Sequence, residues 1–191
     1  MRARLQSLLL GGTLATLVLA PGSPAAGASN VHSMKVYVGY ADGLRGDPTV
    51  PSPWDGDPGV VFVGGGTRFD AGAIRIVNPS AQPLTIGDVS VDIGSLHYDL
   101  WGPYPIVVPG KGSAILTQSE QYDFDTSEPG GGETCDPTGV IPVIHIVVGS
   151  RHPKDRTFLD KGQVLNTGGI DPAACNDLNE GHPWTRIHGH D

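Results

Sequence analysis

Hydrophobic residues in this chain occur in short runs, many of them alternating with polar residues, and glycine and proline separate the runs. Alternation with a period of two places every second side chain on one face of a β-strand, while 28 glycines and 17 prolines interrupt any long helix. Short strands at regular spacing predict an all-β protein with a single antiparallel β-sandwich, immunoglobulin-like or jelly-roll-like. The expected strands cover residues 35–41, 60–63, 72–77, 84–93, 97–100, 106–108, 113–117, 140–148, 157–159 and 163–165.

In the segment 84–93, the alternation of apolar and polar residues shifts by one position. Leu84 and Ile86 share a parity that Val89 and the following apolar residues do not, and the change falls at Gly87-Asp88. A β-bulge, which inserts one extra residue into a strand, would turn all of these apolar side chains toward one core. We therefore predict a bulge at this point.

The segment 140–148 is apolar at both parities and is typical of a central strand without a polar face. His145 lies within it. A single histidine in such a strand is most often a core residue whose ring nitrogens find local partners, and we expect that arrangement here.

The N-terminal segment has the pattern of a secretory signal peptide: a basic start at Arg2 and Arg4, an apolar run over 8–20, and small residues before Ala28. The apolar run is shorter than a membrane-spanning helix. We expect cleavage after Ala28, so that residues 1–28 are the signal peptide and residues 29–191 form one domain. The mature chain should be secreted and should carry no membrane anchor.

Charge narrows the choice of partners. The chain has 12 basic and 20 acidic side chains, a net charge of -8, and the signal peptide contains two of the bases and no acid. A negative protein repels nucleic-acid phosphates and attracts cations and basic partners. We therefore expect no nucleic-acid partner.

Cys135 and Cys175 are the two cysteines of the chain, and in an exported protein they are expected to form a disulfide. Neither belongs to a C-x-x-C pair or to the local context of a nucleophilic cysteine. One short C-terminal helix is also predicted, with Asp171 as its N-cap and Pro172 at its first position. Cys175 would lie on that helix.

Several sequence blocks follow one another along the mature chain. They are VGYAD with LR at 38–45, FDAGAIRI at 69–76, ILTQ at 115–118, FDTS at 124–127 and LNTGG at 165–169. Through these blocks the chain resembles a group of secreted bacterial proteins of unassigned function. The resemblance implies a bacterial, exported, single-domain protein, and it implies no activity, cofactor or catalytic residue.

Acidic loops form the first candidate site. Asp55 and Asp57 lie in one loop and Asp123 and Asp125 in another, and a calcium ion needs several oxygen ligands of this kind. The spacing does not match an EF-hand, and aspartates in loops rich in glycine and proline also cap turns. Calcium binding and ordinary turn capping are therefore both open.

Aromatic loop residues form the second candidate site. Trp54, Tyr122 and Trp184 lie in or beside predicted loops, where flat rings can stack on a sugar or hold another protein. The alternative is that Trp54 and Trp184 cover the ends of the sandwich, because large rings are usually mostly buried.

Motifs of catalysis are missing from the sequence. The chain contains neither a G-x-S-x-G nucleophile elbow nor a phosphate-binding loop that opens a helix. We therefore expect a binding or structural extracellular module rather than an enzyme. A calcium-dependent adhesion or carbohydrate-binding module and a secreted hydrolase with a pair of carboxylates are the alternatives.

Overall fold

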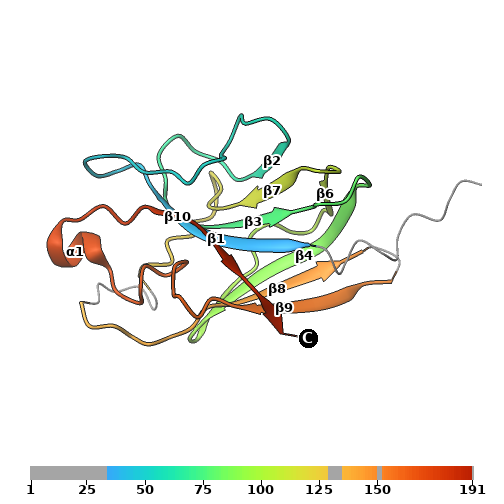
Figure 1. Ribbon diagram of the computed structural model, residues 1–191. Coiled ribbons are helices and arrows are strands. Elements are labelled where there is room, and N and C mark those ends of the chain that lie inside the picture. The colour runs from blue at the N-terminus through green and yellow to red at the C-terminus, as the bar shows by residue number, and fades with distance from the viewer. Residues whose placement is uncertain (1–33, 129–134, 150–151, 191) are drawn as a thin grey trace, which may run out of the picture.

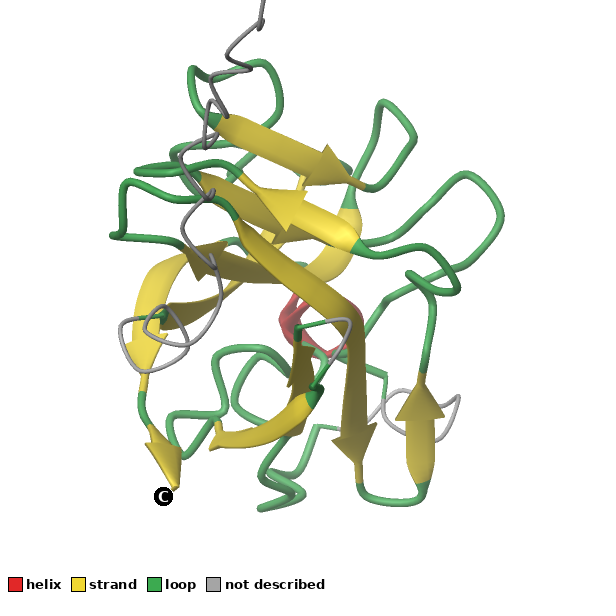
Figure 2. Ribbon diagram, turned by 90° about the vertical axis from the view of Figure 1, so that its right-hand side faces the viewer, coloured by secondary structure: helices red, strands yellow, loops and turns green. Residues whose placement is uncertain are grey.

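A computed structural model describes residues 34–128, 135–149 and 152–190, and shows an all-β sandwich with one short helix (Figures 1 and 2). The fold class predicted from the sequence is confirmed. The predicted signal peptide, residues 1–28, lies outside the described residues. Within the described part of the chain, no helix is long and apolar enough to cross a membrane.

Two sheets face each other across the core. Every neighbouring pair of strands is antiparallel, except that β2 and β7 run parallel. The first sheet has the order β10-β1-β3-β7-β2, with β1 at Lys35–Asp42, β2 at Val60–Val63, β3 at Asp70–Val77, β7 at Ser113–Leu116 and β10 at His182–Ile187. The second has the order β11-β9-β8-β4-β5 with β6 also beside β4; its strands are β4 at Leu84–Ile93, β5 at Leu96–Tyr98, β6 at Ile106–Val108, β8 at Val143–Val148, β9 at Lys154–Leu159 and β11 at Gly189–His190.

The predicted bulge in β4 is confirmed. The register between β4 and β8 shifts between Ile86 and Asp88. Leu84, Ile86 and Val89 are consequently buried in one core, although their spacing in an unbroken strand would place Val89 on the opposite face. The bulge therefore sets which side chains of β4 face outward.

Strand β8 has a half-exposed face, which corrects the expectation of a strand buried on both sides. Ile144, Ile146 and Val148 point into the core, whereas the alternate residues are only half-buried. His145 is on this outward face, and its side chain is 41% exposed, so it is not a core residue. The runs of valine and isoleucine in β8 satisfy strand propensity as well as burial, and the pattern alone does not separate the two.

Three segments near the C-terminus differ from the prediction, one of them the two-residue strand β11, which has no predicted counterpart. Residues 163–165 form turns, because Gln163 has a left-handed backbone and the Asp160 carboxylate accepts a hydrogen bond from the Leu165 N–H. Strand β10 has no predicted counterpart. Its sequence contains Pro183 and no regular alternation, and it forms as an edge strand by pairing with β1.

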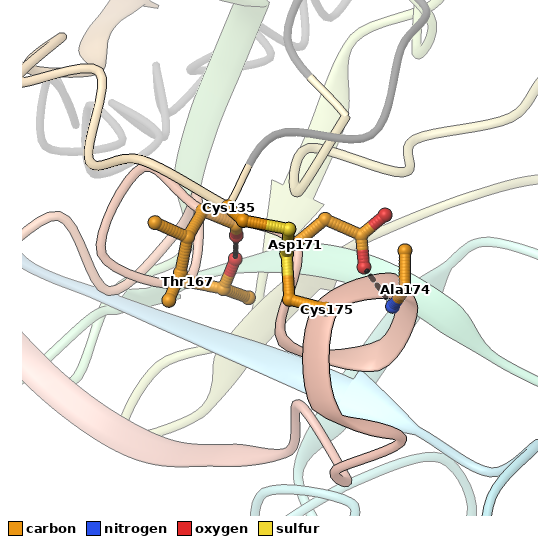
Figure 3. Close-up of a disulfide and its surroundings, with 6 residues drawn as sticks. Cys135, Thr167, Asp171, Ala174 and Cys175 are labelled. Carbon is orange, nitrogen blue, oxygen red and sulfur yellow. Dashed lines mark hydrogen bonds between the residues drawn. A yellow bond between two sulfur atoms is a disulfide. The ribbon is translucent and has the colours of Figure 1, made fainter.

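The short helix α1, Pro172–Asn176, begins as predicted: the Asp171 side chain caps it by accepting a hydrogen bond from the Ala174 N–H at 2.8 Å (Figure 3). The predicted disulfide is also present. Cys135 and Cys175 are bonded with their Cα atoms 5.5 Å apart, which ties α1 to the chain that precedes β8.

Candidate functional site

A carboxylate network lies where the end of β1 meets the start of β3. It consists of Tyr40, Asp42, Arg45, Asp70, Asp125, Ser127 and Glu180. Asp42 and Asp70 are paired in register on the two strands, and the loop after β1 brings Arg45 back over them. The network therefore joins two strand ends to loops that are distant in sequence.

Arg45 is the cation of this network. Its Nη1 atom lies 3.2 Å from Asp42 Oδ2, 2.9 Å from Asp70 Oδ2 and 3.2 Å from a Glu180 oxygen. Asp42 and Glu180 side chains are fully buried, while the Arg45 side chain is 25% exposed. The guanidinium thus stands at the rim with one nitrogen at the point where the three carboxylates converge.

Tyr40 connects this cation site to a second pair of side chains. Its hydroxyl lies 3.0 Å from Asp70 Oδ1 and 2.8 Å from Asp125 Oδ1, so it donates to one carboxylate at a time. Ser127 donates to the same Asp125 oxygen at 2.6 Å. Burial, and then the nearby Asp125 and Asp70 carboxylates, raise the pKa of Tyr40 well above its ordinary value, so it stays a hydrogen-bond donor.

Protonation differs among the acids of the network. Burial and the neighbouring Asp70 charge raise the pKa of Glu180 to about 8, against the opposing effect of Arg45. For Asp42, burial acts to raise the pKa, but hydrogen bonds from the backbone N–H groups of Glu180, Leu44 and Arg45 overcome it and lower the pKa. Glu180 is consequently the group that holds a proton near neutral pH.

Three carboxylates of the network are close enough together to be considered as ligands of a metal ion. Asp42, Asp70 and Glu180 form the one group of three ligating side chains within the described residues whose ligand atoms lie within 4.8 Å of one another. Three oxygens at this separation supply part of the six to eight ligands that calcium takes. Nη1 of Arg45 already stands within 3.2 Å of all three, so the network holds its own cation. Two of its carboxylates, Asp42 and Glu180, are fully buried, and we interpret the network as an ion-pair cluster that stabilises the fold.

The acidic residues predicted to bind calcium are placed separately. Asp57 accepts a hydrogen bond from the Trp54 N–H at 2.7 Å, and Asp123 accepts one from the Asp125 N–H at 3.0 Å. Both are turn-capping contacts. Asp125 belongs to the carboxylate network, and Asp55 is exposed. None of these four belongs to the carboxylate triplet, and their calcium role stays a prediction.

Trp54 and Trp184 lie together on the outer face of the first sheet. Their rings stack with centroids 5.9 Å apart, and Trp54 also meets Phe62 and Phe69 edge to face, each at 5.3 Å. Trp184 Nε1 donates to Pro53 O at 3.1 Å. Beneath them is Gly39, where an added Cβ would lie 3.1 Å from the Trp184 ring. The two tryptophans thus pack a loop onto the sheet, and ligand binding by them stays a prediction.

Tyr122 lies apart from the two tryptophans, at an open depression beside β4. The loop between β5 and β6 is anchored there by Trp101, whose buried ring donates from Nε1 to Thr117 O at 2.8 Å and packs edge to face on Phe124. Tyr122 itself is 48% exposed. The depression has a volume of about 440 Å³ and is lined by Gly87, Asp88, Asp99, Leu100, Gly102, Pro103 and Tyr122.

A second polar constellation, missed by the sequence reasoning, lies on the outward face of the second sheet. Asp92 on β4 contacts His97 Nδ1 at 2.6 Å and His145 Nε2 at 3.0 Å through its two carboxylate oxygens. The hydrogen bond with Asp92, followed by the charges of Asp92, Asp99 and Asp88, raises the pKa of His97, whose side chain is 61% exposed. The bulge in β4 places Asp88 and Asp92 on this face.

Comparison with known proteins identifies no relative: no family model, no curated protein and no solved structure matches this chain.

Proposed function

We propose that the protein is exported and acts as a binding module, with its ligand contact in the depression beside β4. The observation that carries the proposal is the depression itself, whose lining includes the half-exposed Tyr122 and two acidic residues, Asp88 and Asp99. An aromatic ring with a few polar groups in a cleft of 300–1,000 Å³ is the usual form of a small ligand site.

The other candidate groups support this choice because they are engaged in holding the fold. The carboxylates of the network contact Arg45 and Tyr40, and Trp54 and Trp184 pack on each other. Tyr122, in contrast, keeps about half of its surface open to solvent. A rigid ring on a loop supported by a β-scaffold is a common recognition element.

The test is a binding screen of the mature protein against immobilised oligosaccharides and short peptides, repeated with Tyr122→Ala. We expect the ligands retained by the wild type to lose at least several-fold in affinity, while the melting temperature changes little because the ring is half-exposed. Tyr104→Ala is the matched control, since Tyr104 is 80% exposed and does not line the depression. Equal binding by the wild type and Tyr122→Ala would overturn the proposal.

A further inference from the structure

The depression lies over an interruption in the pairing of β4. On the side away from β8, β5 pairs with β4 at residues 91–93 and β6 pairs at residues 84–86. Residues 87–90 have no strand partner on that side among the described residues. Unpaired backbone groups at a strand edge accept the main chain of another extended segment.

Both charged side chains that line the depression are acids, Asp88 and Asp99. A third negative charge, Asp155, is on the same face of the second sheet as Asp88, because Val147 of β8 pairs with both. The charges of Asp99 and Asp88 also act on His97, where they add to the larger effect of the Asp92 hydrogen bond in raising its pKa. Such a surface attracts a positive group and repels a negative one.

The exposed ring of Tyr122 completes the match. The negative face of an aromatic ring attracts a guanidinium or ammonium group, and a flat guanidinium also stacks on the ring. Carboxylates beside the ring accept hydrogen bonds from the same cation. The three features together favour one ligand chemistry, a basic side chain carried on an extended backbone.

We propose that the depression beside β4 binds an extended peptide segment through an arginine or lysine side chain placed between Tyr122, Asp88 and Asp99. The backbone of the segment lies along residues 87–90 on the side away from β8, and its cation enters the depression. This inference rests on the proposed function and names its ligand as a basic segment of a partner protein.

The experiment measures binding of labelled peptides to the mature protein by fluorescence anisotropy at low salt. The probes are a short peptide of alternating arginine and serine, the same peptide with neutral citrulline in place of arginine, and an oligomer of glucosamine. We expect the arginine peptide to bind at least about 10-fold more tightly than the citrulline peptide, because only arginine carries the charge. Raising the salt should weaken the binding.

Variants locate the contact. Tyr122→Ala and Asp99→Asn should each weaken the arginine peptide by about 3- to 5-fold, as expected for exposed cation–π and ionic contacts. Tyr104→Ala and Asp55→Asn are the matched controls, because the first removes an exposed ring outside the depression and the second removes the same charge on another loop. Each control should keep the affinity within about 2-fold.

The outcomes separate the two proposals. Equal binding of the arginine and citrulline peptides, or an equal loss in Asp55→Asn and Asp99→Asn, would overturn the basic segment as the ligand. Binding of the glucosamine oligomer alone, with loss in Tyr122→Ala, would also overturn it but would leave the depression as the binding site. If Tyr122→Ala changes the binding of none of the probes, the proposed function itself fails.

Discussion

Arg45 stands where a divalent cation would sit among Asp42, Asp70 and Glu180. Removing one partner of a buried ion pair leaves uncompensated charge, so we expect Arg45→Ala to lower the free energy of unfolding by about 2–4 kcal/mol. The three oxygens would then form an empty calcium site, and millimolar calcium should restore part of the loss. The measurement is denaturant unfolding of the wild type and the variant, each with calcium and with a chelator.

Arg68→Ala is the control for that experiment, because Arg68 is exposed and lies outside the carboxylate network. It should change stability little and should not respond to calcium. The wild type should not respond through these carboxylates either. A rise in the wild-type melting temperature with calcium that Asp42→Asn abolishes would show that the metal displaces Arg45, contrary to this prediction.

Glu180 should make stability depend on pH in a direction opposite to most carboxylates. Its pKa of about 8 in the folded state lies above the ordinary value of 4.5, so the folded protein holds a proton that the unfolded chain has released. Between those two values the free energy of unfolding therefore falls as pH rises, by at most about 1.4 kcal/mol per pH unit from this group.

Glu180→Gln removes the ionisation and keeps the shape of the side chain. We expect the variant to lose this contribution to the pH slope and to be more stable than the wild type above pH 8. Urea unfolding at a series of pH values measures it, with the exposed Glu120→Gln as control. A variant that is less stable than the wild type at every pH would show that the ionised Glu180–Arg45 pair stabilises the fold.

At the level of elements, the strand pattern was largely readable because burial in a β-sandwich follows a period of two. The same rule located the bulge at Gly87-Asp88, since only an inserted residue places Ile86 and Val89 on one face. It failed for β8, where Val143 and Val147 on the outward face look like core residues. His145 therefore appeared buried in the sequence, while Asp92, its actual partner, is on another strand.

Helix α1 depends on the disulfide more than on its own sequence. It has five residues and none of its side chains is buried, and an isolated helix of that length is not stable in water. The bond between Cys135 and Cys175 closes a loop with a sequence separation of 40, for which the chain-entropy model gives about 4 kcal/mol. We expect reduction to lower the free energy of unfolding by about 2–4 kcal/mol.

Denaturant unfolding with and without a reductant measures that change, and the Cys135→Ser, Cys175→Ser double variant should match the reduced wild type. The two sheets should persist in the variant, because most of their core, including Val36, Ile74 and Val91, lies outside the disulfide loop. Amide hydrogen exchange should therefore increase at α1 and remain slow in β1 and β3. Loss of protection throughout both sheets would contradict this separation.

For the whole molecule, the candidate sites could not be assembled from the sequence because they depend on topology. The blocks at 38–45, 69–76 and 124–127 meet in the carboxylate network, and Glu180 joins them from 135 residues away from Arg45. The spacing of these residues along the chain does not predict which of them are close together in the folded protein. The acidic loops and aromatic residues were visible as residue types, whereas the depression at Tyr122 exists only through the arrangement of β4, β5 and β6.

Export is the remaining whole-molecule prediction, and it rests on the N-terminal pattern together with the disulfide, which forms in oxidising compartments. Expression of the full chain in a secreting bacterial host should release a protein whose N-terminal residue is Ser29, because cleavage is expected after Ala28. N-terminal sequencing and the intact mass of the product in the medium measure it.

Replacing Ala26 and Ala28 with aspartate should block cleavage and keep the chain cell-associated, since the cleavage site requires small residues. Ala81→Asp is the control, because Ala81 is exposed. Ala41 is unsuitable as a control, because its side chain is buried in β1. An uncleaved wild-type chain retained in the cytoplasm would contradict the prediction and would remove the compartment in which the proposed binding module acts.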